Sequence, residues 1–216
     1  MISLIHPSRG RYDRAYHTLR EWISKSSSEI EHILSLDESD PQVARYQNTF
    51  IRNRCANTQI IVNPNSCVVE ATNHAAKIAT GDIMLYLSDD FKCPHNWDKE
   101  LISRFKDVES PMLLKVDDCL QQFHVDVLTI PIMNRGLYER LGYFWHPEYK
   151  SMFVDQDLYW TCHKHNWIVP CPELKFEHQH YSVGKSKKDE TYTRSDSNWN
   201  QGKELYRRRK SLNFPL

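Results

Sequence analysis

The chain has 216 residues, a length that fits one domain of ordinary size. Its 28 lysines and arginines balance its 28 aspartates and glutamates, so no overall positive field exists to attract nucleic acid or an anionic membrane surface. Its six glycines include no pair with the spacing of a dinucleotide-binding fingerprint or a Walker phosphate loop. An anionic ligand must therefore be bound by a few well-placed side chains.

Membrane and secretion signals are missing from the sequence. The apolar runs are short strands, far below the about 20 residues that a membrane helix needs. The first residues lack the order of a secretory signal, and six widely spaced cysteines favour reduced thiols. We therefore expect a cytoplasmic protein with no membrane span.

The first half of the chain alternates between strand and helix patterns. Apolar periodicity predicts strands over 2–6, 30–36, 58–62 and 83–87, helices over 12–23 and 68–79 with Gly81 as a cap, and helix plus loop over 42–57. This order predicts an α/β fold with a central, mostly parallel, twisted sheet and helices on both faces. Ligands of such sheets bind at the carboxyl ends of the strands.

The second half is predicted to add helices over 97–105, 134–141 and from about 155, and strands over 112–116, 124–132 and 168–169. No linker divides the chain. We expect a single domain over 1–216, with one half over about 1–110, another over about 111–185, and a basic tail over 186–216. The segment RRRK (207–210) is interpreted as a solvated helix end, a link to a further C-terminal domain, or a contact to a phosphate-bearing partner.

Two adjacent carboxylates, Asp89 and Asp90, follow the apolar strand 83–87 directly. They repel each other unless positive charge lies nearby, and Mg²⁺ or Mn²⁺ is the hard cation that carboxylates prefer. The alternatives are an N-cap for the helix near Asn96 or a solvated turn. Arg9 and Arg11 follow the first strand, where a guanidinium either binds a diphosphate or is simply solvated.

Asp155 and Asp157 lie near the start of a predicted helix. Asp155 is either an N-cap or a general base for a hydroxyl, and Asp157 a favourable first-turn charge. His178 and His180 stand two residues apart and are candidate metal ligands.

These segments in this order resemble the GT-A-fold glycosyltransferases, specifically the inverting family 2 type and its small viral and phage members, over roughly residues 2–185. The strongest stretch is NHAAKIATGDIMLYLSDDF (73–91), similar to an Asn-containing helix, Gly-Asp, an apolar strand and an Asp-x-Asp metal motif. Ser88 stands where that motif has its first aspartate, and Val154 departs from the acid that usually precedes the base.

The resemblance implies a GT-A (nucleotide-diphospho-sugar transferase) fold and a role for each matching residue. Asp90 would bind Mn²⁺ or Mg²⁺ with His178 or His180, Asp155 would be the catalytic base, and Trp145 and Asp157 would contact the acceptor. The expected contacts to the nucleotide-sugar donor are Pro7, Ser8, Arg9, Asp37, Asn63, Asn73, Lys77, Ser88 and Asp89.

The expected function is a metal-dependent inverting transfer of a sugar from a nucleotide sugar, UDP-linked, to a hydroxyl of a glycan or glycoprotein. UDP-glucose or a UDP-deoxyhexose such as rhamnose is the expected donor, and the host cytoplasm is the site of action if the enzyme is viral. Two alternatives stay open: a nucleotidyltransferase that makes a nucleotide sugar, and a non-catalytic module of the same fold that binds a sugar or nucleotide.

Overall fold

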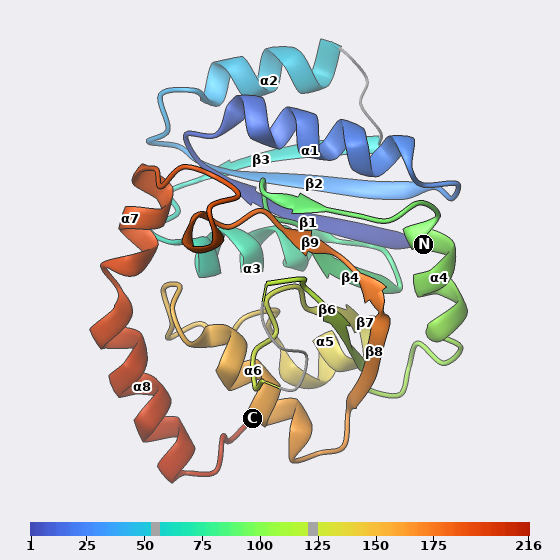
Figure 1. Cartoon of the computed structure of the whole chain (residues 1–216), viewed down its shortest axis with the longest axis vertical. Helices are drawn as coiled ribbons and strands as arrows, with labels where there is room; N and C mark the ends of the chain where they lie inside the picture. Colours follow the sequence, from blue (N-terminus) through green and yellow to red (C-terminus); the bar gives the residue numbers. More distant parts are fainter. Residues whose placement is uncertain (53–56, 121–124) are drawn as a thin grey trace.

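A seven-stranded sheet crosses the centre of the protein (Figure 1). The computed structural model describes residues 1–52, 57–120 and 125–216. In the described part the strand order is β3-β2-β1-β4-β7-β6-β8, and only β7 runs antiparallel to its neighbours, which confirms the mostly parallel sheet. The strands are β1 (Ile2–Ser8), β2 (Ile30–Asp37), β3 (Asn57–Asn63), β4 (Ile83–Tyr86), β6 (Leu113–Asp117), β7 (Ile132–Asn134) and β8 (Ile168–Lys175).

Helices cover both faces of the sheet, as the sequence predicts, and each face has its own apolar core (Figure 1). Buried side chains of one face come from α1 (Tyr12–Ser24), α2 (Val43–Arg52) and α4 (Trp97–Arg104). Those of the other face come from α3 (Val68–Ile78), α5 (Arg135–Leu141) and α6 (Val154–His163). Because helices cover both faces, the central strands β1, β2 and β4 are almost wholly buried, so a ligand can reach the sheet only at the strand ends.

A second, two-stranded sheet pairs β5 (Phe91–Lys92) with β9 (Glu177–His178) in antiparallel register. Phe91 is opposite His178, and the Gln179 amide donates to the Asp90 carbonyl at 2.8 Å. This pairing brings His178, from the last quarter of the chain, beside the two aspartates that follow β4.

The strand predicted over 124–132 is wrong in most of its length. The ladder residues are Ile132–Asn134, while 125–131 have no regular secondary structure, and residue 124 lies outside the described residues. Leu128 and Ile130 are buried without belonging to a strand, so an apolar run here reflects a buried loop.

The predicted Gly81 cap is also wrong, and so are two capping alternatives considered for the aspartates. Phe153 is the N-cap of α6, so Asp155 lies inside the first turn, and the N-cap of α4 is Asn96, without a side-chain bond and not an aspartate of the pair after β4. Helix α3 is capped by Ala79. Gly81 is required for a different reason, because a Cβ there would come within 2.8 Å of the Ser3 backbone nitrogen.

The basic C-terminal residues form α7 (Glu190–Asp196), after a short 3-10 turn at Tyr181–Val183, and then α8 (Trp199–Ser211). Arg209 is 5% exposed, and its Nε donates to Asp157 Oδ2 at 2.7 Å. Asp157 is 1% exposed and also accepts from the Tyr149 hydroxyl at 3.0 Å. The interpretation of a solvated helix end therefore fails for Arg209, although Arg208 beside it is exposed.

We expect Arg209→Met to destabilise the fold by about 3 kcal/mol, because it leaves the buried Asp157 carboxylate without its cation. Arg208→Met is the matched control and should cost less than about 1 kcal/mol, since its pair with Glu148 is exposed. Urea denaturation of both variants measures the difference. Equal stability of the two variants would contradict a structural role for the buried pair.

Candidate functional site

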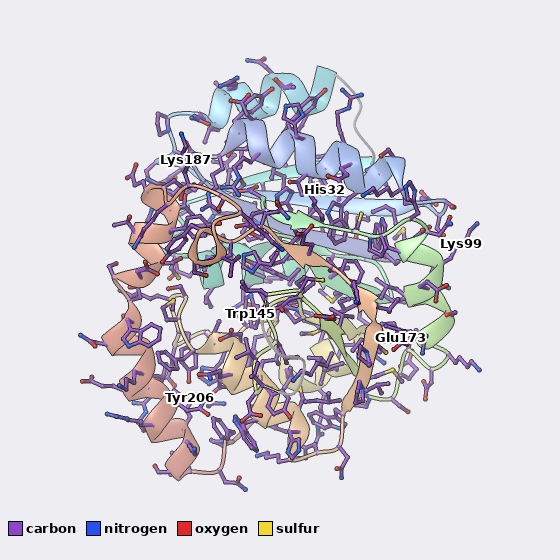
Figure 2. All side chains as sticks on the ribbon, in the orientation of Figure 1. His32, Lys99, Trp145, Glu173, Lys187 and Tyr206 are labelled. Carbon is purple, nitrogen blue, oxygen red and sulfur yellow. The ribbon has the colours of Figure 1, made fainter. Side chains whose placement is uncertain are left out.

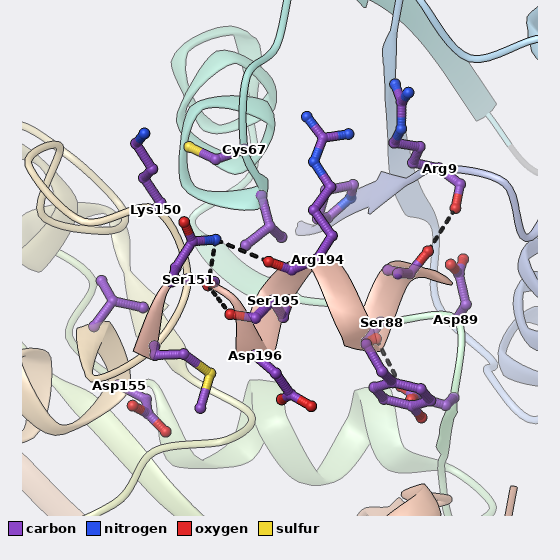
Figure 3. Close-up of a pocket in the computed structure, with 18 of the residues that line it drawn as sticks. Arg9, Cys67, Ser88, Asp89, Lys150, Ser151, Asp155, Arg194, Ser195 and Asp196 are labelled. Carbon is purple, nitrogen blue, oxygen red and sulfur yellow. Dashed lines mark hydrogen bonds between the residues drawn. The ribbon is translucent and has the colours of Figure 1, made fainter. Parts of the chain in front are cut away.

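A cavity of about 680 Å³ opens at the carboxyl ends of β1, β2 and β4 and is bordered by α6, α7 and the start of α8 (Figure 3). Many of the expected site residues line it: Pro7, Ser8, Arg9, Asp37, Ser88, Asp89, Asp90, Trp145, Asp155, His178 and His180. The fold therefore gathers strand ends from the first half and helices from the second around one space.

Asp90 is the most enclosed acid of the cavity, at 4% exposure. The Ser88 hydroxyl donates to its Oδ1 at 2.6 Å, the Tyr192 hydroxyl donates to its Oδ2 at 2.5 Å, and His178 Nε2 lies 3.5 Å from Oδ2. Burial acts to raise the pKa of Asp90, but the hydrogen bonds and charge of His178, with the two hydroxyl donors, outweigh it and hold that pKa well below its usual range. We therefore expect Asp90 to carry a negative charge inside the cavity at neutral pH.

His178 is better placed than His180 to bind the same metal ion as Asp90, because its Nε2 lies 3.5 Å from Asp90 Oδ2. His180 lines the cavity too, but its Nδ1 pairs with the Ser182 hydroxyl at 2.7 Å. Burial, together with the neighbouring His178, lowers the pKa of His180, which favours its neutral form.

Behind Asp89 lies a row of two buried imidazoles. His6 Nε2 is 2.9 Å from Asp89 Oδ1, His6 Nδ1 is 2.9 Å from His32 Nε2, and His32 Nδ1 is 3.0 Å from the Thr58 hydroxyl. Ser8 donates to the other Asp89 oxygen at 3.0 Å. A carboxylate can only accept, so His6 carries a proton on Nε2, and the row fixes how Asp89 faces the cavity.

Asp37 and Arg9 face each other where β1 and β2 end. An Arg9 guanidinium nitrogen contacts Asp37 Oδ2, and the other Asp37 oxygen accepts from the Ser39 amide and hydroxyl, each at 2.9 Å. Arg194 of α7 reaches the same carboxylate at 3.7 Å. This end of the cavity offers a fixed carboxylate acceptor beside two guanidinium groups.

Helix α7 and its N-cap, Asp189, supply two residues that contact the site and that the sequence did not reveal, Asp189 and Tyr192. Asp189 binds Arg11, which lies just before α1 and is 8% exposed: Arg11 donates from Nε and an Nη to the two Asp189 oxygens, each at 2.7 Å. Its guanidinium carbon lies 4.2 Å from the centre of the Tyr192 ring, the same residue that binds Asp90. Periodic apolar residues are the sequence signal for a helix that packs on the core, and α7 lacks that signal because Tyr192 is its one buried residue.

Asp155 lies in the first turn of α6 and lines the cavity on the side away from Arg9 (Figure 3). Burial raises the pKa of this carboxyl, the Gln156 backbone amide offsets part of that effect, and the charge of Asp118 adds to it. A carboxylate whose proton affinity is increased in this way is suited to accept a proton from a ligand.

Four expected contacts do not line the cavity. The side chain of Asn73 is used by backbone groups: its Oδ1 accepts from the Phe144 and Trp145 amides and its Nδ2 donates to the Trp145 carbonyl. Lys77 is exposed on α3, and Asp157 is occupied by its ion pair with Arg209. At the end of β3 the neighbouring Asn65 lines the cavity in place of Asn63.

Trp145 does line the cavity but is 4% exposed and lies near the middle of the molecule (Figure 2). Its ring packs edge-on against Tyr86 at 5.7 Å, and the neighbouring Phe144 is fully buried. These aromatic residues are mainly core, so a ligand reaches only a small part of them.

Residues 3–193 match the family Glycosyl transferase family 2. The chain belongs to this family, and its fold is the GT-A fold that the sequence resemblance implies. No curated protein matches the chain. The match includes β1, the strand-end aspartates, α6 and most of α7.

Solved structures of similar fold share little sequence with the chain. Staphylococcus aureus TarS 1-349 in complex with UDP has a TM-score of 0.64 and 15% identity, over 82% of this chain and 59% of that chain. TarS 1-349 with UDP-GlcNAc gives 0.64 and 15%, over 89% and 60%. A mannosyltransferase from Pyrobaculum calidifontis with GDP-Man and Mn²⁺ gives 0.68 and 13%, over 82% and 56%. The chain thus spans about three fifths of the length of these proteins.

No helix within the described ranges is long and apolar enough to cross a membrane.

We expect His32 to remain neutral in the folded protein well below pH 6.5, because burial, with His6 beside it, lowers its pKa far below the ordinary value. The unfolded chain binds a proton there that the folded chain cannot, so this group lowers stability as pH falls below about 6.5, by up to about 1.4 kcal/mol per pH unit. Ring proton shifts in NMR, assigned with His32→Gln, report the titration. A midpoint near 6.5 would contradict the buried row.

Proposed function

We propose that this protein is a metal-dependent inverting glycosyltransferase that uses a nucleoside diphosphate sugar, UDP-linked, as donor. The observation that carries the proposal is one cavity with two kinds of carboxylate. Asp90, beside His178, keeps its charge, while Asp155, on another element, has a raised pKa. Sugar transfer needs both: a centre that neutralises a leaving diphosphate and a base for the acceptor hydroxyl.

Asp90 and His178 fit a shared divalent cation. Their ligand atoms are 3.5 Å apart, and two ligands at about 2.1 Å from one ion stand about 3.0 to 3.4 Å from each other. Within the described ranges no three His, Cys, Asp or Glu side chains gather as a complete metal cluster. Diphosphate oxygens would supply the missing ligands, which is the usual arrangement for Mg²⁺ and Mn²⁺. When bound, the cation would stabilise charge on the leaving diphosphate.

Arg9, Arg11 and Asp37 support a nucleotide at the end of the cavity formed by β1 and β2. A guanidinium binds phosphate oxygens in two-point fashion, and Arg11 already binds the Asp189 carboxylate in this way. Asp37 is suited to accept a hydrogen bond from a base N–H, and Asp89, held by His6 and Ser8, from a ribose hydroxyl. No glycine-rich loop is needed, because side chains provide the donors.

The reaction follows from the two ends of the cavity. The acceptor hydroxyl oxygen attacks the anomeric carbon of the donor sugar as its proton passes to Asp155 Oδ. The bond from the anomeric carbon to the diphosphate oxygen breaks, and the diphosphate leaves with that electron pair. Attack opposite the leaving group inverts the anomeric configuration.

UDP-glucose or a UDP-deoxyhexose such as rhamnose is the proposed donor, and a hydroxyl of a glycan or glycoprotein the proposed acceptor. The proteins of similar fold were solved with UDP, UDP-GlcNAc and GDP-Man, which supports a nucleoside diphosphate sugar as the class. Action in the cytoplasm, of a host if the enzyme is viral, stays a prediction.

A donor panel tests the proposal. We expect slow release of UDP from at least one UDP-sugar with Mn²⁺ or Mg²⁺, loss of this release in EDTA, and loss of cation-dependent UDP binding in Asp90→Ala. Release of pyrophosphate from UTP and a sugar phosphate would instead identify a nucleotidyltransferase. Binding without turnover of any donor, with or without added sugars, would identify a non-catalytic module.

For Asp155→Asn we expect sugar transfer to fall by about 10² to 10⁴, since an amide cannot accept the proton, with UDP affinity within about twofold of the original protein. Transfer by the original protein should decline as pH is lowered through the raised pKa of Asp155, because only the ionised form is a base. Asp13→Asn is the matched control: it removes an exposed first-turn carboxylate from α1. A fully active Asp155→Asn protein would refute the base assignment.

A further inference from the structure

Trp199 is a large aromatic side chain left open at the edge of the cavity. It is the first residue of α8, lines the cavity and is 49% exposed. Its ring meets the Phe153 ring at 4.9 Å between centroids with an interplanar angle of 63°. Phe153 lies two residues before Asp155 and lines the same cavity, so this aromatic pair adjoins the proposed base.

The backbone beneath the pair is unusual and closely packed. Phe153 has φ 70°, in the left-handed region that bulky side chains rarely adopt. Gly202 of α8 lies over this segment: a Cβ there would come within 2.3 Å of the Met152 carbonyl oxygen and 3.2 Å of the Phe153 ring. A strained residue and a close helix contact persist only where the surroundings enforce them, and such features cluster at ligand sites. Helix α8 therefore sets the position of Trp199 against Phe153.

Polar groups line the same cavity as this aromatic pair. Lys150 is exposed, and Ser151 and Asn198 line the cavity with it. The Asn198 amide donates to the Arg194 carbonyl at 3.0 Å and to the Ser151 hydroxyl at 3.3 Å, which joins the segment before α6 to the segment between α7 and α8. Figure 3 shows Lys150, Ser151 and Asp155 on the side of the cavity away from Arg9. This is the end opposite to the proposed nucleotide.

We propose that Trp199, supported by Phe153, is the platform on which a pyranose ring of the acceptor stacks; this deepens the proposed function and rests on it. A pyranose has one face of C–H groups and a rim of hydroxyls, so it matches an open aromatic face in a cavity that is also lined by an ammonium, an amide and a hydroxyl. Trp145 and Asp157, the acceptor contacts expected from the sequence, are occupied elsewhere. Trp199 thus selects a carbohydrate hydroxyl and presents it to Asp155.

The test compares Trp199→Ala, Trp199→Phe and Leu212→Ala. Leu212 is a matched control, since it is 63% exposed at the other end of α8. Methyl pyranosides of glucose, galactose, mannose and xylose serve as probes. Their binding is followed by saturation-transfer NMR, and sugar transfer to them is measured as the rate of UDP release in excess of the rate without a pyranoside. We expect Trp199→Ala to raise the pyranoside KM about tenfold with donor hydrolysis unchanged, Trp199→Phe to restore most of the loss, and Leu212→Ala to have no effect.

Two results would overturn the platform: no pyranoside binding by the original protein, or equal pyranoside binding by Trp199→Ala. Failure of the proposed function is separate, because it would appear as the absence of UDP release from every donor in the original protein. In that case the NMR comparison of the Trp199 variants still decides whether the aromatic pair binds a pyranose.

Discussion

Buried negative charge at the strand ends is the constraint around which the rest of this structure is arranged. Asp37, Asp89 and Asp90 are each less than a tenth exposed, and they lie at or just beyond the carboxyl ends of β2 and β4. A buried carboxylate without partners costs several kcal/mol. Each of the three therefore has several donors: arginines at Asp37, an imidazole and a hydroxyl at Asp89, and two hydroxyls and an imidazole at Asp90.

These donors come from distant parts of the chain, and this explains why the last thirty or so residues belong to the fold. Tyr192 reaches Asp90, and Asp189 holds Arg11, so α7 closes over the strand ends through contacts that link residues more than 100 positions apart. The Arg209–Asp157 pair then fixes α8 against α6. The same two helices carry the proposed base and the aromatic surface beside it, so satisfying the buried charge also assembles the acceptor end of the cavity.

Local patterns predicted the elements whose apolar residues are periodic, and these fix the strand ends and hence the positions of Asp89 and Asp90. These patterns failed where a residue is buried, or polar, for a reason other than its place in a helix or strand. Residues 125–131 form a loop in which the apolar Leu128 and Ile130 are buried, and Asn73 looks like a polar ligand although three backbone groups use its side chain. Tyr192 could not be found by period, because a polar helix with one buried residue resembles a solvated one. The one sequence signal for such a helix is a single tyrosine or tryptophan in an otherwise polar segment, as at Tyr192 and Trp199.

In the proposed enzyme, the charged end of the cavity binds a nucleoside diphosphate through a cation held by Asp90 and His178. Crystals grown with UDP and Mn²⁺, measured at the manganese absorption edge, test it most directly. We expect one anomalous peak about 2.1 Å from Asp90 Oδ2 and from His178 Nε2, with the diphosphate on its open side and the Tyr192 hydroxyl displaced from Asp90. A diphosphate bound in the cavity without a manganese peak between these two residues would contradict it.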